Sequence, residues 1–216
     1  SADAKYIEPD STFWIVGQSS QTNGYLIKYI LSLDSLIIQD EFTDTLSGYY
    51  PIGSPCFISK EVFYLATDKG GNFGFGTILK YNTKLNTKSV ILHFNGTHGK
   101  KSSGQLLHFE NKIYGLTSSG STNDKGLLFQ INLSDDHIQT ILSFDSTSLS
   151  TPLGGLTIIE NNKLLGVTSN GGLYGNGGIF SMNAGFEPLI KLEDLDESKS
   201  RIPIVYFHSS NDEVYT

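Results

Sequence analysis

The sequence has little charge, almost no cysteine and no long apolar run. Its one cysteine, Cys56, allows neither an internal disulfide bond nor a cysteine metal site. The 15 Lys and Arg residues against 22 Asp and Glu give a net charge of −7, so we expect no nucleic-acid partner. Apolar runs fall short of the roughly 18 residues that a membrane span needs, so we expect no membrane insertion.

Glycine and aromatic residues are abundant instead. The 216 residues include 23 glycines, and 12% of the chain is aromatic. A chain of this length buries roughly 70% of the surface that it exposes when unfolded, which is enough for a single core. The composition therefore predicts a folded, turn-rich protein that forms one domain over residues 1–216.

A repeat of about 50 residues governs the whole chain. Similar apolar segments occupy 13–17, 63–67, 113–117 and 164–168, and a further copy opens at 214–216. A glycine-led apolar run follows each of the first four copies, at 24–29, 76–81, 126–131 and 177–182. Two more apolar runs recur in phase with these, so each unit holds four short runs.

Each run predicts a β-strand. The runs are short, rich in aromatic or β-branched residues, and bounded by Gly, Asn, Ser or Asp. Apolar residues with helical spacing behind a cap are lacking. Tight polar turns at 110–112 and 160–163 join neighbouring runs as antiparallel hairpins. We therefore expect an all-β chain in which each unit is a four-stranded antiparallel meander.

The apolar pattern also predicts how the sheets pack. A sheet with one wet face alternates apolar and polar residues, whereas 127–129 and 204–207 are apolar at successive positions. Both faces of a sheet are therefore covered, which is typical of a β-propeller. We predict four propeller units and a partial fifth, at about 1–52, 53–102, 103–153, 154–200 and 201–216.

Two glycine-rich stretches, 66–80 and 166–180, resemble the GloVer tandem repeat. Members of that family repeat one pattern about every 50 residues: the triplet GTT, then glycines, then the sequence G-T-hydrophobic-F-K. The likeness is clear over 53–216, while the first unit has Gly17 where later copies have threonine. The resemblance implies a propeller-like array with no assigned chemistry, of a kind found mostly in bacterial surface or secreted proteins. It supplies no catalytic residues, and we expect no cofactor.

The partial fifth unit leaves the closure of the ring open. The chain is a fragment of a larger array, or 204–207 supply a missing strand of a four-bladed ring, or residues 1–10 complete a fifth blade. We favour the fragment. If the ring is incomplete, two chains could associate to complete one another.

Ligand contacts are expected on the long loops at one end of the meanders, because binding residues concentrate on such loops. The candidates are Tyr49, Tyr50, Phe73, Phe75, His98, Lys100, Lys101 and Tyr174. Aromatic rings flanked by hydrogen-bonding groups suit a glycan or a protein. The alternative for Phe73 and Phe75 is that they fold inward and fill the gap between blades.

Several repeated polar residues have a structural explanation. A catalytic group is needed once, so the recurrence of Thr67, Thr117 and Thr168 predicts hydroxyl groups that satisfy loop amides at strand ends. Asx residues that follow the fourth strand are expected to start turns: Asp44, Asn95 and Asp145. The acidic residues of 193–197 lack the spacing of a calcium loop, so we expect a solvated face and no metal.

These observations favour a non-catalytic recognition module that binds a glycan or a protein through the loop face. The alternative is a propeller glycoside hydrolase or lyase, which needs two carboxylates about 5–10 Å apart across a central pocket. Its candidate residues are Asp68, Asp124, Asp145 and Asp196. A passive scaffold is a third hypothesis.

Overall fold

The computed structural model describes residues 2–7, 12–19, 22–145, 148–184 and 188–196. Within these ranges the chain forms four antiparallel sheets, and its helical residues are two short 3-10 turns, η1 (Leu31–Leu33) and η2 (Glu160–Asn162). The all-β prediction is therefore confirmed. In the same ranges, no helix has the length and apolar character that crossing a membrane requires.

The first two sheets are four-stranded meanders in chain order. The first consists of β1 (Ala2–Ile7), β2 (Thr12–Ser19), β3 (Thr22–Ile30) and β4 (Ser35–Glu41). The second consists of β5 (Tyr49–Phe57), β6 (Val62–Lys69), β7 (Thr77–Asn82) and β8 (Thr87–His93). In both sheets each strand pairs antiparallel with the next one along the chain.

The third and fourth sheets repeat this order. The third consists of β9 (Lys100–Ser102), β10 (Leu107–Phe109), β11 (Lys112–Ser119), β12 (Leu127–Asn132) and β13 (His137–Ser143). Because β9 and β10 both pair with β11, they are two halves of one interrupted first strand. The fourth sheet consists of β14 (Leu149–Ile159), β15 (Lys163–Gly171), β16 (Gly178–Asn183) and β17 (Ile190–Asp194).

The first strands differ from the sequence prediction. β5 begins at Tyr49, and its pairing with β6 shifts between Ile52 and Cys56, where small and cyclic residues interrupt the apolar pattern. Residues 49–52 thus belong to the second sheet, a few residues before the boundary predicted at about residue 52. Ala2–Ile7 pairs with β2 and is the first strand of the first sheet, not part of a fifth blade. The predicted fifth unit, 201–216, lies outside the described residues.

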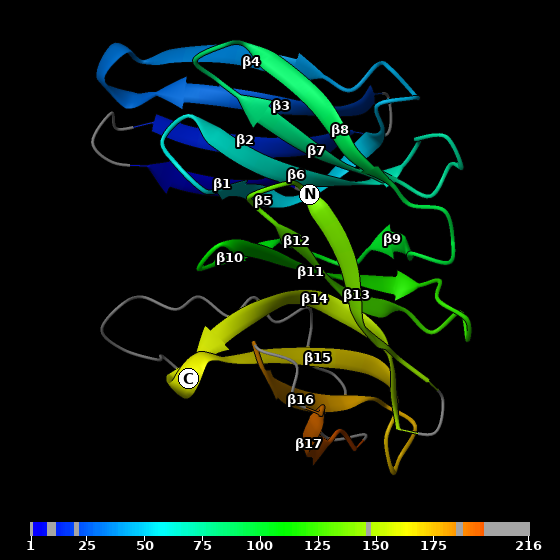
Figure 1. The fold of residues 1–216 in the computed structure, drawn as a ribbon. Coiled ribbons are helices and arrows are strands. Elements are labelled where there is room, and N and C mark those ends of the chain that lie inside the picture. The colour runs from blue at the N-terminus through cyan, green and yellow to red at the C-terminus, as the bar shows by residue number, and fades with distance from the viewer. Residues whose placement is uncertain (1, 8–11, 20–21, 146–147, 185–187, 197–216) are drawn as a thin grey trace.

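Apolar side chains fill the space between consecutive sheets, which lie one beyond the next in chain order (Figure 1). The cluster between the first and second sheets holds Trp14, Val16, Leu26, Phe63, Leu65, Leu79 and Tyr81. Two similar clusters join the second sheet to the third and the third to the fourth. We call the face that meets the preceding sheet the front face, and the face that meets the next sheet the back face. Each buried Leu or Phe contributes roughly 1.5–3 kcal/mol, so burial holds the array together.

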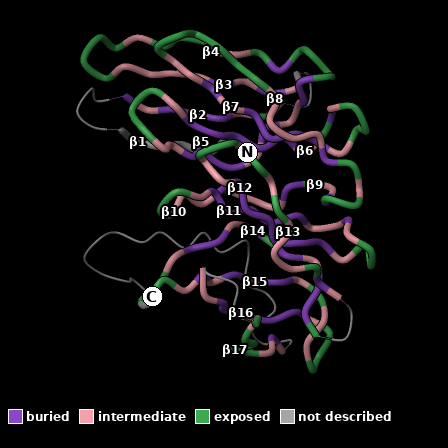
Figure 2. Tube along the Cα trace, viewed as in Figure 1, coloured by how far each residue is buried: buried purple, intermediate pink, exposed green. Residues whose placement is uncertain are grey.

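The fourth strand of each sheet forms its exposed edge. Figure 2 shows long exposed stretches along β4, β8 and β17, whereas the second and third strands of the middle sheets are buried. The two middle sheets are therefore buried at their middle strands by their neighbours. The loops at the two ends of the sheets and the outer edge strands are the parts that can contact other molecules.

Candidate functional site

The loop ends are built on one repeated hydroxyl group. Thr67 Oγ1 accepts a hydrogen bond from the Thr77 amide at 2.9 Å, and its counterparts Thr117 and Thr168 accept from the amides of residues 127 and 178 at 3.2 and 3.1 Å. All three threonines are buried. The prediction that these hydroxyl groups satisfy backbone amides is confirmed, so they belong to the scaffold of the site.

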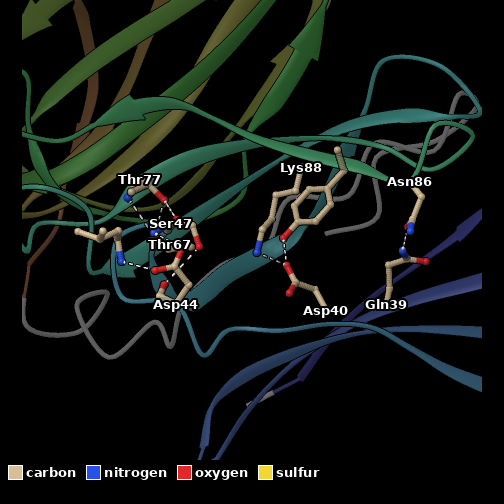
Figure 3. Close-up of polar contacts among 10 residues, drawn as sticks. Gln39, Asp40, Asp44, Ser47, Thr67, Thr77, Asn86 and Lys88 are labelled. Atoms are coloured by element: carbon tan, nitrogen blue, oxygen red, sulfur yellow. Dashed lines mark hydrogen bonds and ion pairs between the residues drawn. The ribbon is translucent and has the colours of Figure 1, made fainter.

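A second polar contact fixes the loop that enters each sheet. The carboxylate of Asp44 accepts hydrogen bonds from the amides of Leu46 and Ser47, and Thr77 Oγ1 donates to the Ser47 carbonyl at 2.7 Å (Figure 3). The Leu46 amide, followed by the Ser47 hydroxyl, lowers the pKa of Asp44. The predicted Asx turns are confirmed here and at the two equivalent loops, where Asn95 and Asp145 accept from backbone amides.

Left-handed residues recur at the start of the first strands. Tyr50, Lys101 and Thr151 have φ of 55°, 55° and 56° and lie at one repeat spacing. The loop of the preceding sheet holds two of them, because Lys101 donates its amide to the Phe75 carbonyl at 3.3 Å and Thr151 donates to the Lys125 carbonyl at 2.8 Å. Each of these residues therefore occupies a fixed place where two blades meet.

Five side chains are linked at the first of these positions by ring contacts or by charge, and we call them the Tyr50 patch: Tyr49, Tyr50, Asp68, Lys69 and Lys101. The rings of Tyr49 and Tyr50 lie 5.3 Å apart. Lys69 Nζ lies 4.9 Å from the centre of the Tyr50 ring. The ammonium groups of Lys101 and Lys69 both act on the carboxylate of Asp68. The patch thus joins the second sheet to the first strand of the third.

Asp68 is the unusual member of the patch. The residues at its position in other sheets donate hydrogen bonds to first-strand carbonyls: Gln18 to Pro51, Ser118 to Lys101 and Ser169 to Thr151. An ionised carboxylate cannot donate. Burial raises the pKa of the half-buried Asp68 carboxyl, and the charges of Lys101 and Lys69 oppose that shift. Asp68 therefore brings an acceptor to a position where the other sheets have donors.

The two loop phenylalanines have different environments. Phe75 packs against the core between the second and third sheets, and Lys100 Nζ lies 5.1 Å from the centre of its ring. Phe73 is 56% exposed. The inward alternative is therefore correct for Phe75, and only Phe73 remains on the surface. Lys100 in turn pairs with Asp124 at 3.3 Å, which ties the Phe75 region to the next loop.

The remaining predicted residues lie apart from the patch or at its border. Lys101 belongs to the patch, whereas the exposed His98 donates its amide to Asn95 within its own loop. Tyr174 is 58% exposed and lines an open depression of about 320 Å³ on the fourth sheet together with Asp194 and Asp196. The structure thus groups Tyr49, Tyr50 and Lys101 and separates Tyr174 from them.

The carboxylates proposed for hydrolysis have other environments. The charged groups that act on the Asp68 carboxyl are the ammonium groups of Lys101 and Lys69, and they do not include a second carboxylate. Asp124 accepts from the Gly120 amide at 2.8 Å, which lowers its pKa together with Lys100. Within the described ranges, no group of three or more His, Cys, Asp or Glu side chains is placed to hold a metal ion. The calcium candidate Glu197 lies outside those ranges.

The family follows from a comparison with protein-family models. The Gloeobacter/Verrucomicrobia repeat model matches residues 2–216. The chain belongs to this family. The match agrees with the GloVer resemblance of the sequence and extends it over the divergent first unit. No curated protein matches the chain.

Solved structures with similar folds are β-propeller-like. TolB from Acinetobacter baumannii has a TM-score of 0.61 at 8% identity, with 89% of this chain and 43% of that chain covered. A chain of the nidogen/laminin complex has 0.61 at 12% identity, with 89% and 64% covered. TolB from Agrobacterium tumefaciens has 0.58 at 12% identity, with 86% and 62% covered. The protein therefore has a propeller-like repeat fold and spans less than two thirds of these chains.

Proposed function

We propose that the protein is a non-catalytic recognition module, secreted or on a cell surface, that binds a glycan or a protein segment through its loop face. The Tyr50 patch carries the proposal. It places the ring of Tyr50 beside the ring of Tyr49 and the ammonium group of Lys69, and the charges of Lys69 and Lys101 act on the carboxylate of Asp68. Flat apolar faces bind a flat partner, and polar groups around them fix its orientation.

The chemistry of the patch favours a glycan with acidic groups. The face of Tyr50 suits a sugar ring, the Asp68 carboxylate can accept from sugar hydroxyls, and Lys101 can donate to a carboxylate. Two lysines against one aspartate give the patch a positive balance within a chain of net charge −7. A positive patch on a negative protein attracts anionic ligands preferentially.

Among the four described sheets, the patch is a single site rather than one of several similar sites. The residues equivalent to Tyr50 are Lys101 and Thr151, which share its φ but not its aromatic ring. The equivalents of Asp68 are Ser118 and Ser169. Affinity must therefore come from one continuous surface, and not from the avidity of repeated weak sites.

Tyr50→Asn tests this proposal without disturbing the backbone, because Asn tolerates positive φ better than most residues. The wild-type protein and the variant are compared on an array of neutral and acidic glycans, and the dissociation constant of each hit is then measured by calorimetry. Loss of the ring should weaken binding about fivefold, because an aromatic contact contributes about 1 kcal/mol and about 1.4 kcal/mol corresponds to tenfold.

Thr151→Asn is the matched control, since it places the same side chain in the same conformation on another sheet. It should leave binding unchanged. Equal binding by wild type and Tyr50→Asn would contradict the proposed site. Binding to a protein library but to no glycan, with the same loss in Tyr50→Asn, would keep the site and identify a protein as the ligand.

A further inference from the structure

Two sheet faces have no neighbouring sheet in the described part of the chain. They are the front face of the first sheet and the back face of the fourth. On the front face of the first sheet, Leu36 and Ile38 of β4 lie opposite Tyr29 and Ile27 of β3. These two side chains are 60% and 51% exposed. On the back face of the fourth sheet, Ile190 of β17 is 51% exposed. Large apolar side chains gathered on one surface mark an interaction site.

The interior of the array shows what covers a front face. The residues of the second sheet equivalent to Ile15, Ile27 and Tyr29 are Leu65, Leu79 and Tyr81, which are at most 5% exposed. They are covered by the back face of the first sheet, through the side chains Trp14, Val16 and Leu26. The third and fourth sheets repeat the arrangement. In this fold the occupant of a front face is a back face.

The fourth sheet offers a back face of this kind. Its residues are Leu165, Val167, Ile179 and Ile190, read from the pairing of β15 with β16 and of β16 with β17. Leu165 and Val167 occupy the positions of Trp14 and Val16 in the first sheet, and Ile179 occupies that of Leu26. This back face therefore has the same apolar positions as those that cover the front faces inside the molecule.

Charge at the hairpin end agrees with such contact. Between the second and third sheets, Tyr64 and Lys80 of a back face bind Asp136, the left-handed residue in the hairpin of the following sheet. Asp34 is the equivalent residue of the first sheet, with φ of 45°. In the fourth sheet Leu165 and Ser181 occupy the positions of Tyr64 and Lys80, and the charged group at this end of its back face is Lys163.

We propose that a second copy of this chain docks the back face of its fourth sheet on the front face of the first sheet, head to tail. The contact extends the blade-to-blade interface that the chain uses internally. Such an interface is heterologous, because two different surfaces meet, and two copies that satisfy both contacts close into a ring. The proposal concerns sheet faces, so it stands independently of the ligand site on the loop face.

Variants of the two faces test the proposal by analytical ultracentrifugation. Leu36→Glu with Ile38→Glu changes the front face, and Val167→Glu with Ile190→Glu changes the back face. Each double variant should raise the dissociation constant at least about 100-fold, because unpaired charges are costly to bury. Leu85→Glu is the matched control: Leu85 is an exposed leucine on the β7–β8 hairpin, and its replacement should leave association unchanged.

Mixing the two double variants gives the decisive result. Each retains one intact face, so an equimolar mixture should form a complex of two chains although neither variant associates alone. A wild-type mass of one chain at every concentration would overturn the proposal. Association that is lost only in the front-face variant would also overturn the proposal. That result means either that two front faces pair with each other or that the back face is occupied by the same chain. Circular dichroism of each variant shows whether its sheets remain folded.

Discussion

The phenol of Tyr81 donates a hydrogen bond to the carboxylate of Asp40 over 2.6 Å, from the second sheet to the first. Lys88 Nζ binds the same carboxylate oxygen at 2.8 Å, and the contact lies beside the amides of Gln39 and Asn86 (Figure 3). Burial, with the nearby charge of Asp40, raises the pKa of Tyr81 well above its ordinary value. Two blades are therefore tied by a polar contact as well as by their apolar cluster.

Tyr81→Phe is expected to destabilise the protein by about 1–2 kcal/mol. A hydrogen bond to a charged group contributes about 1.5–3 kcal/mol, and here Lys88 still compensates Asp40 after the hydroxyl is removed. Urea unfolding measures the change. The ring stacks on Phe63 at 4.8 Å and is retained in the variant, so apolar packing should not change.

Tyr29→Phe provides the control for this prediction. Tyr29 also donates to an aspartate, Asp34, at 2.5 Å, but that pair is exposed in the single chain, so the two variants are compared at protein concentrations where the chain is monomeric. Exposed polar contacts contribute little, so the variant should lose much less stability than Tyr81→Phe. Equal losses in the two variants would show that burial of the Tyr81 contact is not what makes it stabilising.

Thr67→Val is expected to cost about 1–3 kcal/mol. It leaves the buried amide of Thr77 without its acceptor, and an unsatisfied buried group costs that much. It also removes one of the two partners of the Thr77 hydroxyl, which keeps its bond to the Ser47 carbonyl. Thr67→Ser keeps the hydroxyl and should lose much less. Thr83→Val removes an exposed hydroxyl that donates to the Glu61 carbonyl, and thermal unfolding should show little change.

The fold could be predicted from the sequence because each sheet has apolar residues at the same positions. Phe63, Ile113 and Leu164 recur at one spacing and are all fully buried between sheets, so the packing that determines the fold also produces the visible repeat. The start of β5 was not accessible. Its register shift falls on Gly53, Ser54 and Pro55, which break the apolar pattern that marks a strand.

The site was only partly accessible. Tyr50, Lys101 and Thr151 share a backbone conformation but no side-chain chemistry, so their equivalence is hidden from a search for similar residues. The prolines that follow two of them, Pro51 and Pro152, are the signal that could have revealed the position. Phe73 and Phe75 are alike in sequence, and only tertiary packing separates the exposed ring of Phe73 from the partly buried ring of Phe75.

Asp68 predicts how stability changes with pH. The pKa of its carboxyl is raised in the folded state above the ordinary value of 3.8. As pH rises through this interval, the unfolded chain loses its proton first and the native state binds more protons, so the free energy of unfolding falls. The stability that protonated Asp68 contributes is therefore fully present below pH 3.8 and is lost above the folded-state pKa.

Asp68→Asn removes the ionisable carboxyl and with it the loss of stability above the folded-state pKa. The thermal midpoint of the variant should therefore exceed that of wild type at pH 7 and approach it at pH 3. Asp44→Asn should behave in the opposite sense, because the Leu46 amide lowers the pKa of Asp44 and its contribution is present above pH 3.8. Differences between each variant and wild type, measured by scanning calorimetry at both pH values, cancel the titration of the other carboxylates. An Asp68→Asn midpoint below wild type at pH 7 would show that the attraction of Lys69 and Lys101 outweighs the desolvation of Asp68.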